Sequence, residues 1–98
     1  MAINKQFLKT KPVCKVTFTV PAEEANQVNV VGSFNAWNAQ ANPLKKLKNG
    51  SFKGALNLDQ GQSYEFRYVI DGAYVNDDQA DAYQWSDFAG ADNGVLNL

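Results

Sequence analysis

Apolar and polar residues alternate with a period of two along much of the chain. In residues 13–20 every second position is apolar, namely Cys14, Val16, Phe18 and Val20. Residues 64–70 show the same alternation, with aromatic or aliphatic side chains at 64, 66, 68 and 70. Successive side chains of a strand point to opposite faces, so each segment is expected to form a strand with one buried face.

Turn residues separate these segments and divide the chain into short strands. Asn49-Gly50 and Asp71-Gly72 are both typical of two-residue hairpin turns, because each pair tolerates positive φ. No segment has a convincing helical period. The predicted strands cover residues 13–20, 28–31, 44–48, 51–58, 64–70, 73–76 and 95–98.

About seven short strands in a chain of 98 residues predict an all-β fold, an immunoglobulin-like β-sandwich. The chain lacks the cysteine pair of a true immunoglobulin domain. Residues 1–12 are predicted to be an N-terminal extension, and residues 13–98 to form the sandwich domain.

Composition narrows the classes of function. The net charge is -1, without the basic surplus that nucleic-acid binding requires. The absence of histidine excludes catalytic systems that use imidazole, and the single cysteine, Cys14, excludes an intrachain disulfide and a multi-cysteine zinc site. No apolar run approaches the roughly 20 residues that span a bilayer, and residues 1–13 do not resemble a secretory signal. We therefore expect a cytoplasmic protein without cofactors or metal.

Three blocks of sequence carry a family resemblance. The first is Val-Val-Gly-Ser-Phe-Asn-Ala-Trp at residues 30–37, and the second runs from Asn49-Gly50 to Tyr-Glu-Phe-Arg-Tyr-Val-Ile-Asp-Gly at residues 64–72. The third extends from Asn76 through Tyr83 to Asn-Gly-Val-Leu at residues 93–96. Together they resemble carbohydrate-binding module family 48, which includes isoamylase and branching-enzyme N-terminal domains and the glycogen-binding domain of AMP-activated kinase β subunits.

The resemblance covers residues 13–98 and implies a non-catalytic module that binds α-1,4-linked glucans such as glycogen, starch or maltooligosaccharides. An α-glucan-active enzyme is a further partner that it implies. The alternative is a protein-interaction domain of the same fold that docks on an enzyme or self-associates without binding sugar. A glycosidase is disfavoured, because a small sandwich has no deep cleft to hold an acid and a base.

Four residues are candidates for carbohydrate contact. Trp37 matches a sugar-stacking tryptophan of the family, although it could instead fold over the edge of the core. The two-residue turn pairs Val69 with Tyr74 and places Tyr74 on the exposed sheet face, diagonal to Arg67. The family has tryptophan and lysine at these two positions. The alternative for Tyr74 and Arg67 is an ordinary cation–π pair, and Asn93 is either a ligand contact or part of an Asn-Gly turn.

Further residues, most of them in the third block, are interpreted from the sequence around them. Trp85 is expected to cover the core in preference to touching ligand. The family leucine that clasps sugar has no clear equivalent, and Phe88 and Ala89 lie nearest to its position. The aspartates between residues 77 and 92 do not match a calcium-loop spacing and are expected to form a solvated loop. Cys14 lies in an apolar row and is predicted to be buried.

Overall fold

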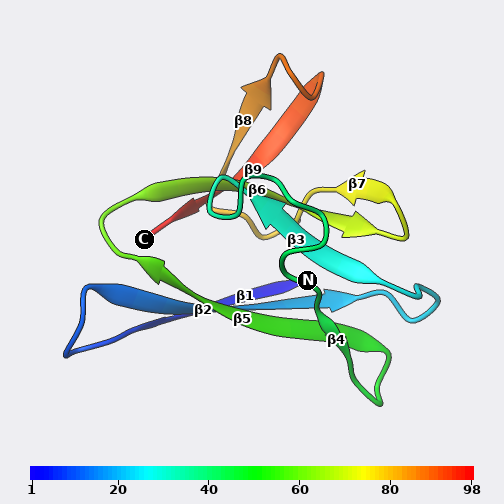
Figure 1. Cartoon of the computed structure of the whole chain (residues 1–98), viewed down its shortest axis with the longest axis horizontal. Helices are drawn as coiled ribbons and strands as arrows, with labels where there is room; N and C mark the ends of the chain where they lie inside the picture. Colours follow the sequence, from blue (N-terminus) through cyan, green and yellow to red (C-terminus); the bar gives the residue numbers. More distant parts are fainter.

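The computed structural model describes all 98 residues as two antiparallel sheets packed face to face (Figure 1). It confirms the predicted all-β sandwich and contains no helix, hence none that could cross a membrane. The first sheet has the order β1-β2-β5-β4. Its strands are β1 (Ala2–Phe7), β2 (Val13–Pro21), β4 (Lys45–Lys46) and β5 (Ser51–Asp59).

The second sheet has the order β3-β6-β9-β8, and β7 pairs with the outer part of β6. Its strands are β3 (Val28–Gly32), β6 (Ser63–Ile70), β7 (Ala73–Val75), β8 (Ala82–Ser86) and β9 (Ala91–Asn97). The β8–β9 hairpin extends beyond the first sheet and forms a projecting arm (Figure 1). The second sheet packs its inner face against the core, and its outer face points away from the first sheet.

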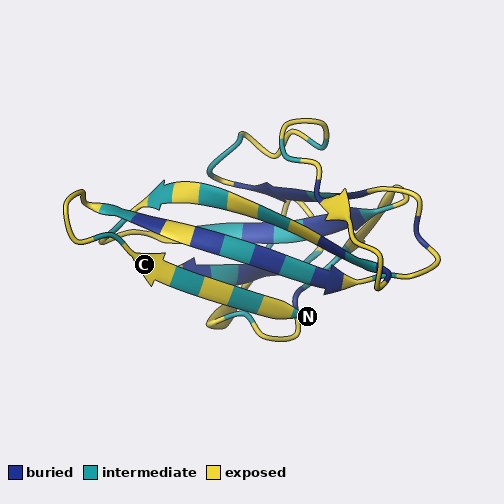
Figure 2. Ribbon diagram, turned by 90° about the horizontal axis from the view of Figure 1, so that it is seen from below, coloured by how far each residue is buried: buried dark blue, intermediate teal, exposed yellow.

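The core lies between the sheets and is built from the alternating apolar positions. Twelve buried residues form one cluster, and the Cys14 row of β2 contributes four of them, all fully buried. Figure 2 shows this alternation as bands of buried and less buried residues along the strands. Phe18 packs against Phe66 and Tyr68 with ring centroids 5.7 and 6.1 Å apart. The predicted burial of Cys14 is confirmed.

A hydrogen bond between two fully buried side chains fixes the end of this core. The Tyr68 hydroxyl donates to Asp77 Oδ2 at 2.6 Å. Asp77 also accepts the backbone N–H of Gln79 at Oδ1, and its carbonyl accepts the Tyr83 hydroxyl. Asp77 is therefore not part of a solvated loop, contrary to expectation. It stays buried because its acceptor atoms have protein donors.

The variant Tyr68→Phe is expected to lose less stability than the wild type as the pH rises above about 10. Burial first, and then the hydrogen bond to Asp77, raise the pKa of Tyr68 well above its ordinary value. The folded protein therefore keeps a proton that the unfolded chain releases. The stabilisation is complete below the unfolded pKa and falls with rising pH above it, by up to about 1.4 kcal/mol per pH unit. Urea unfolding from about pH 8 to pH 11 measures this slope.

The exposed Tyr74, replaced in the same way, serves as the control. Tyr74→Phe should keep the slope that Tyr68→Phe loses. Equal slopes for the wild type and Tyr68→Phe would contradict the assignment.

The structure corrects the boundary predicted at Val13. Residues 2–7, predicted as part of an extension, form the edge strand β1, which pairs with β2 along its whole length. Lys5 of β1 donates to Asp81 Oδ2 at 2.6 Å and thereby links the first sheet to the residue that precedes β8. Burial alone would raise the pKa of Asp81, but hydrogen bonds from Lys5 and the Asn97 N–H, with the lysine charge, lower it. The N-terminal strand is thus an integral part of the sandwich.

Candidate functional site

The loop that follows β3 is held in place by one amide side chain. Asn35 Oδ1 accepts the backbone N–H of Gly32 at 3.0 Å, while its Nδ2 donates to the Val30 carbonyl at 3.1 Å and to Asn42 Oδ1 at 2.7 Å. Gly32 is required because a Cβ there would lie 2.5 Å from the Glu65 carbonyl oxygen. The Gly-Ser-Phe-Asn part of the first block therefore has a structural role, which is to shape the loop that carries Trp37.

Ala36 and Trp37 both adopt left-handed backbone conformations, with φ of 56° and 58°. This conformation is uncommon for residues with a Cβ, and particularly for bulky ones. The Trp37 N–H donates to the Gly32 carbonyl at 3.0 Å and so closes the turn. The indole remains 38% exposed. The loop thus holds a large aromatic ring at the surface in a strained backbone geometry.

The Asp71-Gly72 turn fixes Tyr74 as predicted. Both turn residues have positive φ, and the register pairs Ile70 with Ala73 and Val69 with Tyr74. Tyr74 is 51% exposed, which confirms the predicted exposure. The Arg67 Cζ lies 5.8 Å from the centroid of the Tyr74 ring. The two side chains therefore form a cation–π pair on the outer face of the second sheet.

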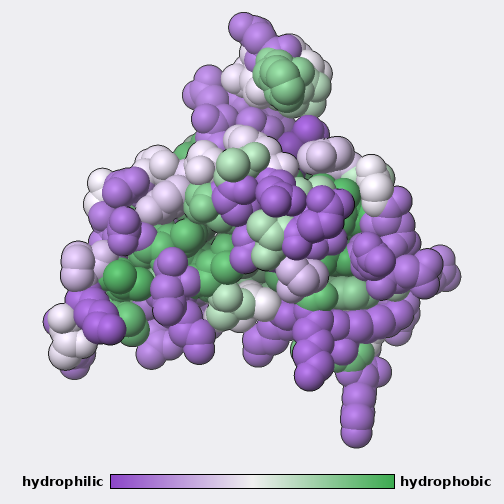
Figure 3. All heavy atoms as spheres, in the orientation of Figure 1, coloured by the Kyte–Doolittle hydropathy of each residue, from purple (hydrophilic) through white to green (hydrophobic).

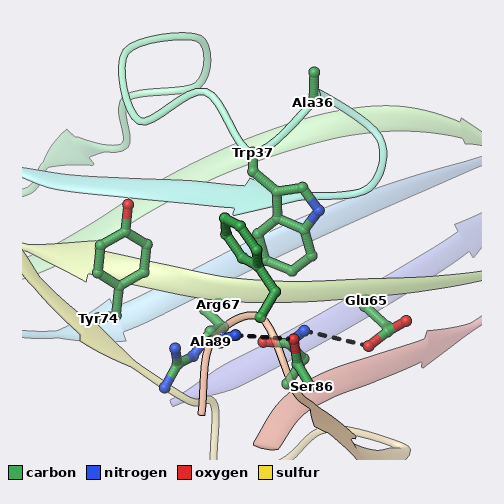
Figure 4. A pocket seen from close by; sticks show the side chains of 9 residues that line it. Ala36, Trp37, Glu65, Arg67, Tyr74, Ser86 and Ala89 are labelled. Carbon is green, nitrogen blue, oxygen red and sulfur yellow. Dashed lines mark hydrogen bonds between the residues drawn. The ribbon is translucent and has the colours of Figure 1, made fainter. Parts of the chain in front are cut away.

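All four predicted site residues line one groove on this face. The groove has a volume of about 940 Å³, and Trp37, Arg67, Tyr74 and Asn93 contribute to its walls. Figure 4 shows Trp37 reaching in from the loop after β3 and Tyr74 from β7, with Arg67 and Glu65 on the strand between the loop and the β8–β9 hairpin. Two aromatic rings thus flank a polar floor.

The floor contains polar atoms with unused hydrogen-bonding capacity. Asn93 is only 5% exposed, and its Nδ2 donates to Glu65 Oε1 at 3.2 Å. Neither Asn93 Oδ1 nor Arg67 Nε has a hydrogen-bond partner in the protein. Buried polar atoms without partners are rare in folded proteins. The hydrogen bond from Asn93 orients the Glu65 carboxylate. Glu65 lines the groove, and it was not among the residues predicted from the sequence.

The projecting hairpin forms the remaining wall. Ser86, Phe88 and Ala89 line the groove, so the two residues nearest to the family's clasping position do reach it. Phe88 is fully exposed, and Figure 3 shows an apolar side chain at the tip of the arm. Trp85, in contrast, does not cover the core: it is 57% exposed, and its indole N–H donates to Asp87 Oδ1 at 2.8 Å. It alternates with the groove residue Ser86 and lies on the other face of β8, where the arm extends past the first sheet.

Comparison with known proteins identifies the family. The family described as carbohydrate-binding module 48 (isoamylase N-terminal domain) matches residues 7–84. A 1,4-alpha-glucan branching enzyme of Deinococcus radiodurans is 40% identical over 63 residues, which is 63% of this chain and 9% of the enzyme. Protein PTST homolog 2, chloroplastic, of Arabidopsis thaliana is 38% identical over 53 residues, which is 54% of this chain and 10% of that protein.

A 1,4-alpha-glucan branching enzyme of Chlamydia caviae is 39% identical over 56 residues, 55% of this chain and 8% of the enzyme. The chain thus spans about a tenth of the length of these relatives. The family match includes β2 to β7 and extends into β8, and with it Trp37, Arg67 and Tyr74. The chain belongs to the carbohydrate-binding module 48 family.

Proposed function

We propose that this domain binds α-1,4-linked glucan chains in the groove between Trp37 and Tyr74. The observation that carries the proposal is the convergence of two exposed aromatic rings on a floor that contains Arg67 and Glu65. Aromatic faces suit the C–H faces of sugar rings, while a guanidinium donates to and a carboxylate accepts from sugar hydroxyls. The branching enzymes that the chain resembles are named for 1,4-alpha-glucan, which agrees with this ligand class.

Binding is proposed to occur without chemistry on the sugar. Glycosidases generally use a pair of carboxyl groups on either side of the scissile bond. Glu65 is the one carboxylate among the residues that line this groove, and Asn93 donates a hydrogen bond to it. The groove therefore offers contacts for a chain but not the acid and base of a hydrolase.

A titration of the wild type with maltoheptaose and β-cyclodextrin tests the proposal. Stacking on two rings and a few hydrogen bonds, offset by immobilisation of the glucan, give a net of roughly 4–6 kcal/mol, or dissociation constants from about 1 mM to tens of micromolar. NMR shifts should concentrate at Trp37, Arg67, Tyr74 and Asn93. The β-linked cellohexaose, titrated in parallel, should produce much smaller shifts. Binding with shifts on the outer face of the first sheet would contradict the proposed site.

The protein-interaction alternative is favoured by one observation. Tyr83 and Trp85 are about half exposed, and the two lie outside the groove on the projecting hairpin. If the domain does not retard on native gels cast with glycogen, and sediments as a dimer, this alternative takes precedence over glucan binding.

A further inference from the structure

A second groove lies next to the first on the outer face of the second sheet. Its volume is about 590 Å³, and it is lined by the loop before β3, the start of β3, the loop before β4 and the Asp71-Gly72 turn. Tyr74 lines both grooves. The two grooves therefore meet at a residue that is already assigned to sugar stacking.

The register of the strands makes the two grooves parts of one continuous face. Val69 of β6 pairs with Asn29 of β3 on one side and with Tyr74 of β7 on the other, and these three residues form a row across the sheet. Along β6, Glu65 and Arg67 line the first groove and Val69 lines the second. At a rise of about 3.3–3.4 Å per residue, Glu65 and Val69 are roughly 13 Å apart along the strand. This distance exceeds one sugar ring, so a longer chain can extend from one groove to the other.

The second groove has the side-chain chemistry of a sugar subsite. Val69 lies at the base of the groove, and because it is 8% exposed it contributes a small apolar surface there. Four amide residues also line the groove, and their side chains make no hydrogen bond within the protein: Asn26, Gln27, Asn29 and Gln40. Each amide can donate and accept at once, which matches the neighbouring hydroxyls of a pyranose.

The loop that carries two of these amides is held in a fixed conformation. The Asp71 carboxylate accepts the backbone N–H of Asn26 at 3.0 Å and that of Gln27 at 2.8 Å. Asn29, the second residue of β3, forms an isolated antiparallel β-bridge with Pro43, which also lines the groove. A ligand would therefore meet amides on a largely preformed backbone, which reduces the entropy lost on binding.

We propose that the second groove is an extension subsite, which binds the part of an α-glucan chain that continues past Tyr74. This inference rests on the proposed function of the first groove. A short oligosaccharide fills the aromatic groove alone, whereas a longer one also contacts Val69 and the amides. Affinity should therefore rise with chain length beyond the length that saturates the first groove.

The experiment compares maltotriose with maltodecaose on three proteins: the wild type, the double variant Asn29→Ala with Gln40→Ala, and a control. The control is Asn57→Ala with Gln6→Ala, which removes two exposed side-chain amides from the first sheet, away from both grooves. The double variant should bind maltotriose like the wild type but maltodecaose about threefold to tenfold more weakly. The control should bind both sugars like the wild type. Backbone NMR signals of Gly72 and Gln40 in the wild type should shift with maltodecaose and not with maltotriose.

Three results would overturn the inference, and they are distinguishable. Wild-type affinity of the double variant for maltodecaose, with unshifted Gly72 and Gln40 signals, would confine binding to the first groove. Equal weakening of both sugars would show that the two amides act through the fold or the first groove. Failure of the wild type to bind either sugar would remove the proposed function itself.

Discussion

Trp37→Ala should weaken the binding of maltoheptaose at least about tenfold. Loss of an aromatic contact removes about 0.5–1.5 kcal/mol beyond the effect of buried area, and the lost apolar surface adds to this. The indole lines the groove and is 38% exposed, so it is available to a ligand without rearrangement. Isothermal titration calorimetry measures the change, and we expect it to exceed that of Tyr74→Ala or Arg67→Ala.

Two further variants distinguish the effect of losing the indole of Trp37 from the effect of its backbone conformation. Trp85→Ala removes the other tryptophan, which is 57% exposed and does not line the groove, and it should bind like the wild type. Trp37→Gly also removes the indole but relieves the left-handed strain, since glycine adopts φ near 58° readily. It should be more stable than Trp37→Ala and bind equally weakly. Wild-type affinity in either Trp37 variant would show that the indole is not a sugar platform.

Asn35→Ala should lower the free energy of unfolding by about 2–3 kcal/mol. The variant removes three hydrogen bonds at a partly buried site, and each contributes about 0.5–1.5 kcal/mol. Maltoheptaose binding should weaken as well, although Asn35 does not line the groove, because its amide holds the loop that carries Trp37. Urea unfolding gives the stability change, and calorimetry below the transition gives the affinity.

Asn38→Ala is the matched control in the same loop. The Asn38 side chain accepts one hydrogen bond, from the Gln40 N–H at 2.9 Å, at an exposed position. Its removal should change stability by less than about 1 kcal/mol. If the two variants had equal free energies of unfolding, the hydrogen bonds of Asn35 would not be what holds the loop.

Local patterns were sufficient to predict the strands that bury an apolar row. The alternation on β2 and β6 identified six of the twelve core residues, and the Asp71-Gly72 turn gave the position of Tyr74, because its two-residue length leaves one register. All seven predicted strands are present, with ends that differ by a few residues. Turn chemistry and periodicity are local signals that can be read from the sequence without knowledge of which strands pair.

The two strands that the pattern missed are stabilised by distant partners. In β1, Lys5 lies on the same face as Ile3 and interrupts the apolar alternation. The lysine fits there because it donates a hydrogen bond to Asp81, which is 76 residues away in the sequence. In β8, Tyr83 and Trp85 do alternate with polar residues, but they stay about half exposed, and the strand forms through its pairing with β9. The expectation that Trp85 covers the core failed for this reason: a burial argument does not apply to an arm that passes the edge of the sandwich.

The residues of the candidate groove could be predicted in part. Trp37, Arg67, Tyr74 and Asn93 were found from the family resemblance and the hairpin register, and they line the same groove. Glu65 was missed, although it lies two residues before Arg67 and therefore on the same outward face of β6, which was an available signal. The second groove depends on loops that lie side by side only in the folded chain, and no spacing along the sequence indicates it.

At Trp37 the proposed ligand contact and the stability of the fold favour different residues. A bulky residue in the left-handed region is destabilised by about 1–3 kcal/mol, whereas glycine or asparagine adopts that conformation more easily. Under the proposed function, the need for an aromatic ring maintains tryptophan there, so family members that do not bind sugar are expected to carry the smaller residues while their core rows stay intact. The residue at this position would then distinguish sugar-binding domains of this family from domains of the same fold that do not bind sugar.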